Sequence, residues 1–567
     1  MSPRDIHHGT RVTPFLVKAT IVACLGGILF GYDLGVISGA LPSLTKSLDL
    51  SSTQSETVVS FLYVGSIFGA LVGGWVCDRF GRRTAIMYTD VAFLIGAIVL
   101  ACAPGYGAVL CGRAVVGVAV AISALADVSY LTEISPEHHR GALVSCNEAC
   151  ISLGFLLSYI SSYFVSVNVA HGEGWRLMFG LSGLIAVLQW CLMIRMPESP
   201  VWLDEMGREE EAQLALRRIT QGEGSVEESA DLELHEGEGE SEEGEDGAPE
   251  DEPAGYLKDG AASPDLPHEH PAVSHYWRQA VIAGFLAVAQ QFCGNINILN
   301  FAPEIFAQLF YGTSTEDNSE ALLVTTIILG SVKFLITSLV IWEVDTIGRR
   351  YLLLGGVGLI TTSLLFLVIA FSTGLETEFL NSSTGAVDTR YSTTQQGLAL
   401  VGCTGVVAGY ALSYGPLTWL ITSEVFPANI RGRALGSMTV LTHASAVLFS
   451  YTFLSLQEAV SPAAPFGLYF SCSFLSLCFA YVAVPDTGGV KAEGDGEDVD
   501  ELLDGMCFWR QQCCCCFWWC CSLCGGGSGG GSRRERLEKD GSLRDVGDEF
   551  GDPDEDLPTP SGLAPIT

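Results

Sequence analysis

Long runs of apolar residues limit the fold of this 567-residue chain more than any other feature. The stretches 91–103, 181–193 and 352–371 contain no Asp, Glu, Lys or Arg. A helix needs roughly 20 mainly apolar residues to cross a bilayer, and inside lipid only helices and closed barrels satisfy their backbone groups. Because the runs lack the alternation of barrel strands, the sequence predicts an all-α polytopic membrane protein.

The runs predict twelve transmembrane helices in two groups of six. The first group lies near residues 16–42, 57–77, 84–103, 106–132, 142–167 and 175–196, and the second near 277–309, 321–343, 350–373, 397–425, 433–457 and 464–485. The first run is long and rich in glycine, and no small-residue cleavage pattern follows it. We therefore interpret it as a retained helix and not as a signal peptide.

Basic residues in the short loops predict the orientation of the chain. The opposite loops hold only Lys46, Arg176 and Arg390, whereas one set of alternate loops carries Arg79, Arg82, Arg83, Arg140, Arg349, Arg350, Arg431 and Arg433. Basic loops favour the cytoplasmic side, so both termini are predicted to be cytoplasmic. The glycosylation acceptor Asn381, in Asn-Ser-Ser, then falls on the outside.

Three short motifs occur twice in the same order and indicate two related halves. The first copies are Asp78-Arg-Phe-Gly-Arg-Arg, Glu133 with Arg140, and Pro197-Glu-Ser; the second copies are Asp345-Thr-Ile-Gly-Arg-Arg, Glu424 with Arg431, and Pro485-Asp-Thr. Parallel six-helix repeats imply a pseudo-two-fold axis along the membrane normal and a site between the halves. We predict halves at 16–196 and 277–485, joined by a cytoplasmic loop at 197–276 and flanked by a cytoplasmic N-terminus (1–15) and tail (486–567).

The segments outside the spans carry most of the net charge of −35. Between Arg218 and Lys258 there are fifteen acidic residues and no basic one, a composition typical of solvated disorder. No basic patch supports a nucleic-acid role. In the tail, eight cysteines within 507–524 lie among Phe and Trp residues, which favours S-acylation and contact with membrane lipids over a metal site. The chain has no P-loop and no zinc motif, so we predict no cofactor, no metal and no enzyme activity.

Several motifs resemble the sugar porter branch of the major facilitator superfamily, solute carrier family 2. They are Gly74 with the Asp78 motif, Pro197-Glu-Ser-Pro, Gln290-Gln291 and Gly415-Pro-Leu-Thr-Trp419. Within the branch, the sequence is most similar to the class III glucose transporters of types 10 and 12, because Glu148, Lys333 and the late Asn297 match that pattern. The resemblance implies the major facilitator fold and a small-molecule sugar substrate.

Amides and one aromatic ring within the spans are the predicted sugar ligands. Sugar hydroxyls need amide donors and acceptors beside an apolar platform. Gln290 and Asn297 lie two helical turns apart on one face, with Gln291 adjacent, and Trp419 can cover the sugar ring. The resemblance assigns these positions to the sugar, and we add Asn295 and Phe30 to the predicted contacts. The alternative is that the amides only bond neighbouring helices.

Two further sets of charged residues are expected to take part in the transport cycle. By resemblance to proton-linked symporters, Asp33 of the first span faces Arg113 of the fourth, and protonation of Asp33 would release Arg113. A static buried pair is the alternative. Glu148 and Lys333 lie in different halves and either bridge them or bind the sugar directly, which the sequence leaves open.

The cytoplasmic ends of the spans carry a predicted ionic gate. By resemblance to the family, its members are Asp78, Arg82, Glu133, Arg140 and Glu198 in the first half, and Asp345, Arg349, Glu424 and Arg431 in the second. Such pairs would hold helix ends together while the carrier faces outward and separate when it faces inward.

These observations predict a secondary transporter of a hexose or related polyol, working by alternating access with or without coupled protons. The alternatives are a facilitative uniporter of glucose, dehydroascorbate or inositol, and a non-transporting sugar sensor. The acidic dileucine Leu502-Leu503 fits the pattern that endocytic adaptors bind, so the plasma membrane, endosomes or both are the expected locations.

Overall fold

The computed structural model describes residues 13–169, 173–221, 276–311, 319–372, 377–380, 387–426 and 428–486, with Leu503, Met506, Phe508 and Trp509. Within these residues, twelve helical segments are long and apolar enough to cross a membrane, which confirms the predicted number. The fifteen acidic residues between Arg218 and Lys258, the eight cysteines within 507–524, Asn381 and Leu502 lie outside the described residues.

The N-terminal half is built from six long helices. They are α1 (Pro14–Leu48), α2 (Ser52–Phe80), α3 (Arg82–Ala101), α4 (Tyr106–Ile134), α5 (Glu137–Asn168) and α6 (Gly174–Met193). Two short helices follow in the predicted central loop, α7 (Pro200–Glu205) and α8 (Glu209–Gln221). Helix α1 continues six residues beyond the predicted end at residue 42, because a helix satisfies its own backbone bonds in water as well as in lipid.

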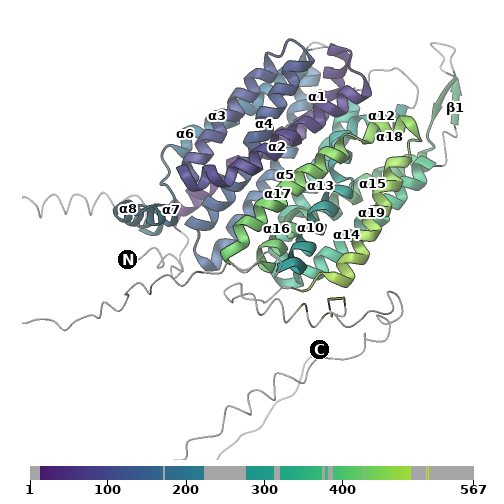
Figure 1. Ribbon diagram of the computed structural model, residues 1–567. Helices are drawn as coiled ribbons and strands as arrows, with labels where there is room; N and C mark the ends of the chain where they lie inside the picture. Colours follow the sequence, from purple (N-terminus) through teal and green to yellow (C-terminus); the bar gives the residue numbers. More distant parts are fainter. Residues whose placement is uncertain are drawn as a thin grey trace, which may run out of the picture. The chain divides into compact units, whose positions relative to one another are not determined.

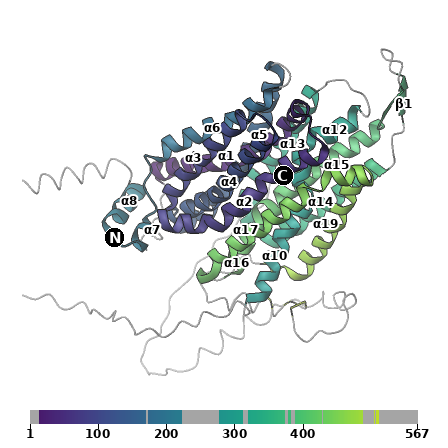
Figure 2. The ribbon, with the colours of Figure 1, turned by 45° about the horizontal axis from the view of Figure 1, so that its top comes forward.

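The C-terminal half repeats the pattern with more interruptions. Its helices are α10 (Trp277–Phe292), α11 (Asn295–Asn300), α12 (Ala302–Tyr311), α13 (Ser319–Ile347), α14 (Arg349–Ser372), α15 (Thr393–Leu412), α16 (Tyr414–Val425), α17 (Ala428–Ser450), α18 (Phe453–Ala459) and α19 (Ala464–Ala483). Strands β1 (Thr377–Leu380) and β2 (Val387–Arg390) pair antiparallel between α14 and α15. Figures 1 and 2 show the two groups of helices in separate colours.

Local sequence signals begin several of these helices. The Thr13 hydroxyl accepts a hydrogen bond from the Leu16 N–H at 3.1 Å, with Pro14 in the first turn of α1. Ser51 with Gln54 forms a reciprocal capping box at α2, and Ser392 with Gln395 forms another at α15. Each box satisfies backbone donors that the first helical turn leaves unpaired.

Close backbone contact joins α1 to α5 in the N-terminal half. A Cβ atom added at Gly31 would overlap the Ile151 carbonyl oxygen, and one added at Gly154 would overlap the Ile28 carbonyl oxygen. The two helices therefore touch through main-chain atoms, which only glycine allows at these positions.

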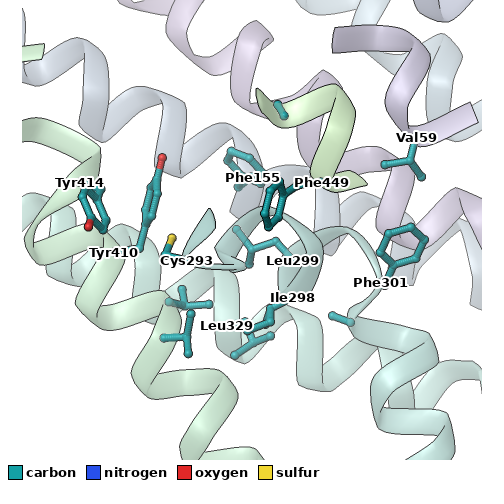
Figure 3. Close-up of a cluster of buried hydrophobic side chains, with 14 of the residues drawn as sticks. Val59, Phe155, Cys293, Ile298, Leu299, Phe301, Leu329, Tyr410, Tyr414 and Phe449 are labelled. Carbon is teal, nitrogen blue, oxygen red and sulfur yellow. The ribbon is translucent and has the colours of Figure 1, made fainter. Parts of the chain in front are cut away.

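The buried core draws on both halves, whereas large apolar side chains face outward elsewhere. Figure 3 shows Val59 and Phe155 of the N-terminal half in one cluster with Leu299, Tyr410 and Phe449 of the C-terminal half. On the outer faces, Trp75 of α2 is 62% exposed and Leu184 of α6 is 67% exposed. Outward apolar surface of this kind fits a lipid environment.

Candidate functional site

The seventh span is broken where the predicted sugar ligands lie. Helix α10 ends at Phe292, and Gly294 adopts a left-handed backbone (φ +78°) before α11 begins. A Cβ atom at Gly294 would also overlap the Tyr469 ring of α19. The span predicted near residues 277–309 is therefore present but divided into α10, α11 and α12, because the left-handed Gly294 turns the chain. The break places Asn295 and Asn297 on a separate short helix beside the end of α10.

Four amide side chains gather around this break, and each is at most 7% exposed: Gln290, Gln291, Asn295 and Asn297. The Gln290 Nε2 atom donates to the Tyr410 hydroxyl of α15 at 3.1 Å. Every one of the four side-chain oxygens lacks a hydrogen-bond partner among the described residues. Buried acceptors are normally satisfied, so this end of α10 offers acceptors to a polar molecule that carries hydroxyl groups.

Asn297 is fixed more firmly than the other three amides. Its Nδ2 atom donates to the Phe449 carbonyl oxygen of α17 at 2.9 Å and to the Tyr469 hydroxyl of α19 at 2.6 Å. Both partners belong to the same half as Asn297. The amide thus bonds neighbouring helices, as the alternative interpretation expected, while its oxygen remains without a partner.

The predicted aromatic contacts come from α16 and α1. Trp419 is half-buried and lies one helical turn after Gly415, where an added Cβ atom would lie 3.5 Å from the Glu148 Oε1 atom of α5. Residues four apart share a helix face, so Trp419 lies on the face of α16 that is directed toward α5. Phe30 of α1 is half-buried and packs against the core shared by the halves.

Lys333 reaches from α13 across to α5. Its Nζ atom lies 3.6 Å from the centroid of the Phe155 ring, a cation–π contact. No ion pair within 4.0 Å joins Lys333 to Glu148 among the described side chains. The halves instead meet at this level through the hydroxyls of Ser152 and Thr337, 3.1 Å apart.

Asp33 and Arg113 are adjacent and almost fully buried, each 1% exposed. The Arg113 Nη1 atom donates to the main-chain carbonyl of Asp33 at 3.1 Å, and Nε donates to the Val58 carbonyl at 3.3 Å. Among the described side chains, the Asp33 carboxyl forms no ion pair within 4.0 Å, and its Oδ2 atom has no hydrogen-bond partner. The guanidinium thus contacts the backbone of Asp33 and not its carboxylate.

The gate residues of the N-terminal half form one cluster around the start of α3. The Arg82 Nε atom lies 2.8 Å from the Glu133 Oε1 atom, and Arg82 Nη1 lies 3.4 Å from Asp78 Oδ1. Glu198 accepts hydrogen bonds from the N–H groups of Arg83 (2.7 Å) and Thr84 (3.2 Å). These contacts join α3, α4 and the segment before α7 within one half.

The C-terminal half has a matching ion pair among its described side chains. The Arg349 Nε atom lies 3.3 Å from the Glu424 Oε1 atom. The last arginine of each motif makes an equivalent hydrogen bond in the two halves. Arg83 donates to the Ile194 carbonyl at the end of α6, and Arg350 donates to the Tyr481 carbonyl near the end of α19, each at 2.7 Å. The side chains of Arg140, Asp345 and Arg431 lie outside the described ones.

Sequence reasoning missed three aromatic residues that shape this region. The Tyr410 hydroxyl accepts a hydrogen bond from Gln290, and the Tyr469 hydroxyl accepts one from Asn297. The Phe155 ring makes the cation–π contact with Lys333. The sequence did offer one signal for Tyr410, because a tyrosine hydroxyl inside a predicted span needs a polar partner. In the structure Tyr410 lies just before the break at Ser413 between α15 and α16.

Comparisons with known proteins identify relatives of this chain by sequence and by fold. Residues 19–496 match the family model described as "Sugar (and other) transporter". The facilitated glucose transporter member 10 of Danio rerio is 29% identical over 86% of this chain and 92% of its own length, and the arabinose-proton symporter of Escherichia coli K12 is 29% identical over 87% and 94%. A partially occluded inward-open structure of the xylose transporter XylE from E. coli superposes with a TM-score of 0.64 at 27% identity, covering 84% of this chain and 100% of that one.

Proposed function

The chain belongs to the sugar transporter family of the major facilitator superfamily, and from this membership we propose that it moves a hexose or related polyol together with protons. It is a multi-pass membrane transporter and not an enzyme. Alternating access between the two six-helix halves is the transport mechanism of this fold. The proposal concerns the residues that bind the sugar and the residues that couple it to protons.

We propose that the sugar binds at the break between α10 and α11. The observation that carries this proposal is the group of four buried amide oxygens without hydrogen-bond partners among the described residues. Sugar hydroxyls are donors that satisfy such acceptors. Trp419 supplies an apolar face from α16, and Glu148 and Lys333 provide charged groups from the two halves. The site would thus contain groups from both halves, as alternating access requires.

We propose that Asp33 carries the coupled proton. A buried carboxylate is stable only when it is paired or hydrogen-bonded. The polar neighbour of the Asp33 carboxyl is the Ser182 hydroxyl, which donates its own proton to the Phe179 carbonyl, and the nearby cation, Arg113, bonds the backbone of Asp33. This is the arrangement expected when the carboxyl holds a proton and is neutral. Losing that proton would leave a charged carboxylate, which would attract the guanidinium.

Uniport is the second candidate, favoured by the 29% identity to a facilitated glucose transporter. The two candidates separate in proteoliposomes that contain the wild-type protein. Labelled glucose, galactose, inositol and dehydroascorbate are supplied at external pH 7.5 and 5.5, and a pH-sensitive dye inside reports protons. Symport predicts faster uptake at the lower pH with a proton influx that depends on the substrate. Sugar entry without any proton flux at either pH would establish uniport.

We propose the plasma membrane and endosomes as the locations, with both termini in the cytoplasm. The dileucine signal has to be accessible to an adaptor, yet Leu503 is fully buried and Trp509 donates its Nε1–H to the Ala483 carbonyl at the end of α19 (2.9 Å). The signal would therefore act only after this segment detaches. Replacing Leu502 and Leu503 with Ala should raise the surface fraction, measured by surface biotinylation, and an unchanged fraction would contradict the sorting role.

Lipidation and glycosylation complete the proposal for the segments outside the described residues. Acylation of the cysteines in 507–524 predicts hydroxylamine-sensitive labelling with a palmitate analogue, which should vanish when all eight become Ser. Glycosylation at Asn381 predicts a smaller apparent mass for Asn381→Gln. Equal labelling or equal mass in parent and variant would reject each assignment.

A further inference from the structure

Hydrogen bonds join the two halves at the end of the bundle that is remote from the Arg82 and Arg349 clusters. Glu56 of α2 accepts from the Ser455 N–H of α18 at 2.9 Å with one oxygen and from the Ser455 hydroxyl with the other. A second bond links Ser52 of α2 to Glu458 of α18. Because α2 begins near this end and reaches the Arg82 cluster with its last turn, these bonds mark the opposite end of the pathway.

The two carboxylates differ in their surroundings. Glu56 is fully buried, and both of its oxygens are used by Ser455, whereas Glu458 is exposed to solvent. Buried charge-assisted hydrogen bonds are stronger than neutral ones, and a buried charge that loses its partners is costly. A bond made by an exposed carboxylate contributes little. Of these two carboxylates, Glu56 therefore makes the stronger polar contact between the halves.

The contact between the halves continues inward from Glu56. Tyr63, two turns further along α2, lies beside Asn300 of α11, and its ring centroid is 6.5 Å from that of His443 on α17. Asn300 is 3% exposed and belongs to the opposite half from Tyr63. Separation of the halves at the Glu56 end would thus expose Asn300 to solvent.

We propose that Glu56 locks the two halves together at this end, and that breaking its bonds to Ser455 is a required step whenever the sugar pathway opens there. The proposal rests on the alternating access of the proposed function. Rocking of one half against the other must separate α2 from α18. The Glu56–Ser455 contact then sets part of the equilibrium between the state closed at this end and the state open at it.

A single cysteine at Asn300 reports on this equilibrium without any sugar. The variant Asn300→Cys is treated with a membrane-impermeant maleimide, and labelling at that position is quantified by mass spectrometry, which separates it from the native cysteines. Glu56→Gln removes the charge and Ser455→Ala removes one donor. Each should speed labelling, by about tenfold for Glu56→Gln, which corresponds to about 1.4 kcal/mol. Glu458→Gln, at the exposed neighbouring contact, is the matched control and should leave the rate unchanged.

Unchanged labelling in both Glu56→Gln and Ser455→Ala would overturn the proposal, as would an equal increase in Glu458→Gln. If Glu56→Gln fails to assemble, Ser455→Ala carries the test, because it alters only one hydroxyl on a half-buried position. Failure of the proposed function would be seen separately, as absence of sugar uptake by the wild type, and would leave the labelling result intact.

Discussion

The first span of each half occupies the same place in the repeat, yet the two spans differ in continuity and chemistry. Helix α1 runs unbroken for 35 residues and carries one buried acid, Asp33, beside Arg113 of α4. The matching span of the second half is divided into α10, α11 and α12; uncharged amides lie at its break, and its one acid, Glu304, lies beyond the break in the first turn of α12. An intact helix satisfies its own backbone and leaves only side chains for chemistry, whereas a broken one turns amides toward a cavity. We interpret this as a division of labour, with proton coupling in the first half and sugar binding in the second.

Asp33→Asn, in the first span of the first half, is expected to have the largest effect on transport. It imitates the neutral acid permanently, so the proton gradient can no longer drive the cycle. Accumulation of sugar against its gradient should fall to equilibrium, while exchange of sugar across the membrane continues. Asp90→Asn, a buried acid on α3, is the matched control and should keep accumulation. Accumulation that persists in Asp33→Asn would place the coupled proton elsewhere.

Gln290→Ala tests the other side of the comparison. Gln290 donates to Tyr410 and, in the proposed site, accepts from a sugar hydroxyl, so its loss should weaken apparent sugar affinity at least about tenfold, or about 1.4 kcal/mol. Trp419→Ala should have a similar effect. Gln189→Ala removes an equally buried amide from α6 in the first half and should leave the affinity unchanged. Binding is read from substrate competition at constant surface expression, and equal losses in Gln290→Ala and Gln189→Ala would remove Gln290 from the site.

Gly294→Ala tests the break between α10 and α11, which distinguishes this span from the unbroken α1. A left-handed alanine that also meets the Tyr469 ring should lower stability by about 1 kcal/mol or more. Gly284→Ala on the regular part of α10 has ordinary space for a methyl group, 3.7 Å from a Leu441 methyl, and should stabilise slightly. Thermal unfolding in detergent measures both, and equal shifts would contradict the strained backbone at Gly294.

Glu198→Asp gives the smallest expected effect and compares the two ionic clusters. The second half has Asp486 at the matching position. Shortening Glu198 should weaken its bonds to the N–H groups at the start of α3, at a cost of about 0.5 kcal/mol. Thermal unfolding should show a small loss, and Asp486→Glu is the reciprocal control. A loss as large as that of Gly294→Ala would mean that the cluster does more than cap a helix.

The twelve spans and the repeat could be predicted because they depend on apolar length and on motifs that recur in order. The break at Gly294 could not, because a glycine within an apolar run does not reveal its φ angle. Glu56 was also missed: the predicted second span began at residue 57, which left Glu56 in a loop, whereas α2 begins at Ser52 and buries it. Its partner lies about 400 positions away and is known only once the halves are assembled.

The distance between Glu148 and Lys333 could not be predicted from the sequence, for a different reason. Both residues were identified from their charge within spans, but they belong to different halves, so their separation depends on how far one half has rocked against the other. Arg113 shows the same limit on a smaller scale. Its proximity to Asp33 follows from the resemblance, whereas the sequence does not indicate that it donates to the main-chain oxygen of Asp33 and not to the carboxylate.

The contact of α1 with α5 at Gly31 and Gly154 has a mechanical consequence. Main-chain atoms that touch directly have no side-chain torsions between them to absorb a displacement, so the contact is stiff. Asp33 on α1 and Glu148 on α5 are therefore carried by one rigid unit. In the proposed cycle, a displacement of α1 that follows protonation of Asp33 would thus reach Glu148 without being absorbed by rotamer changes between the two helices.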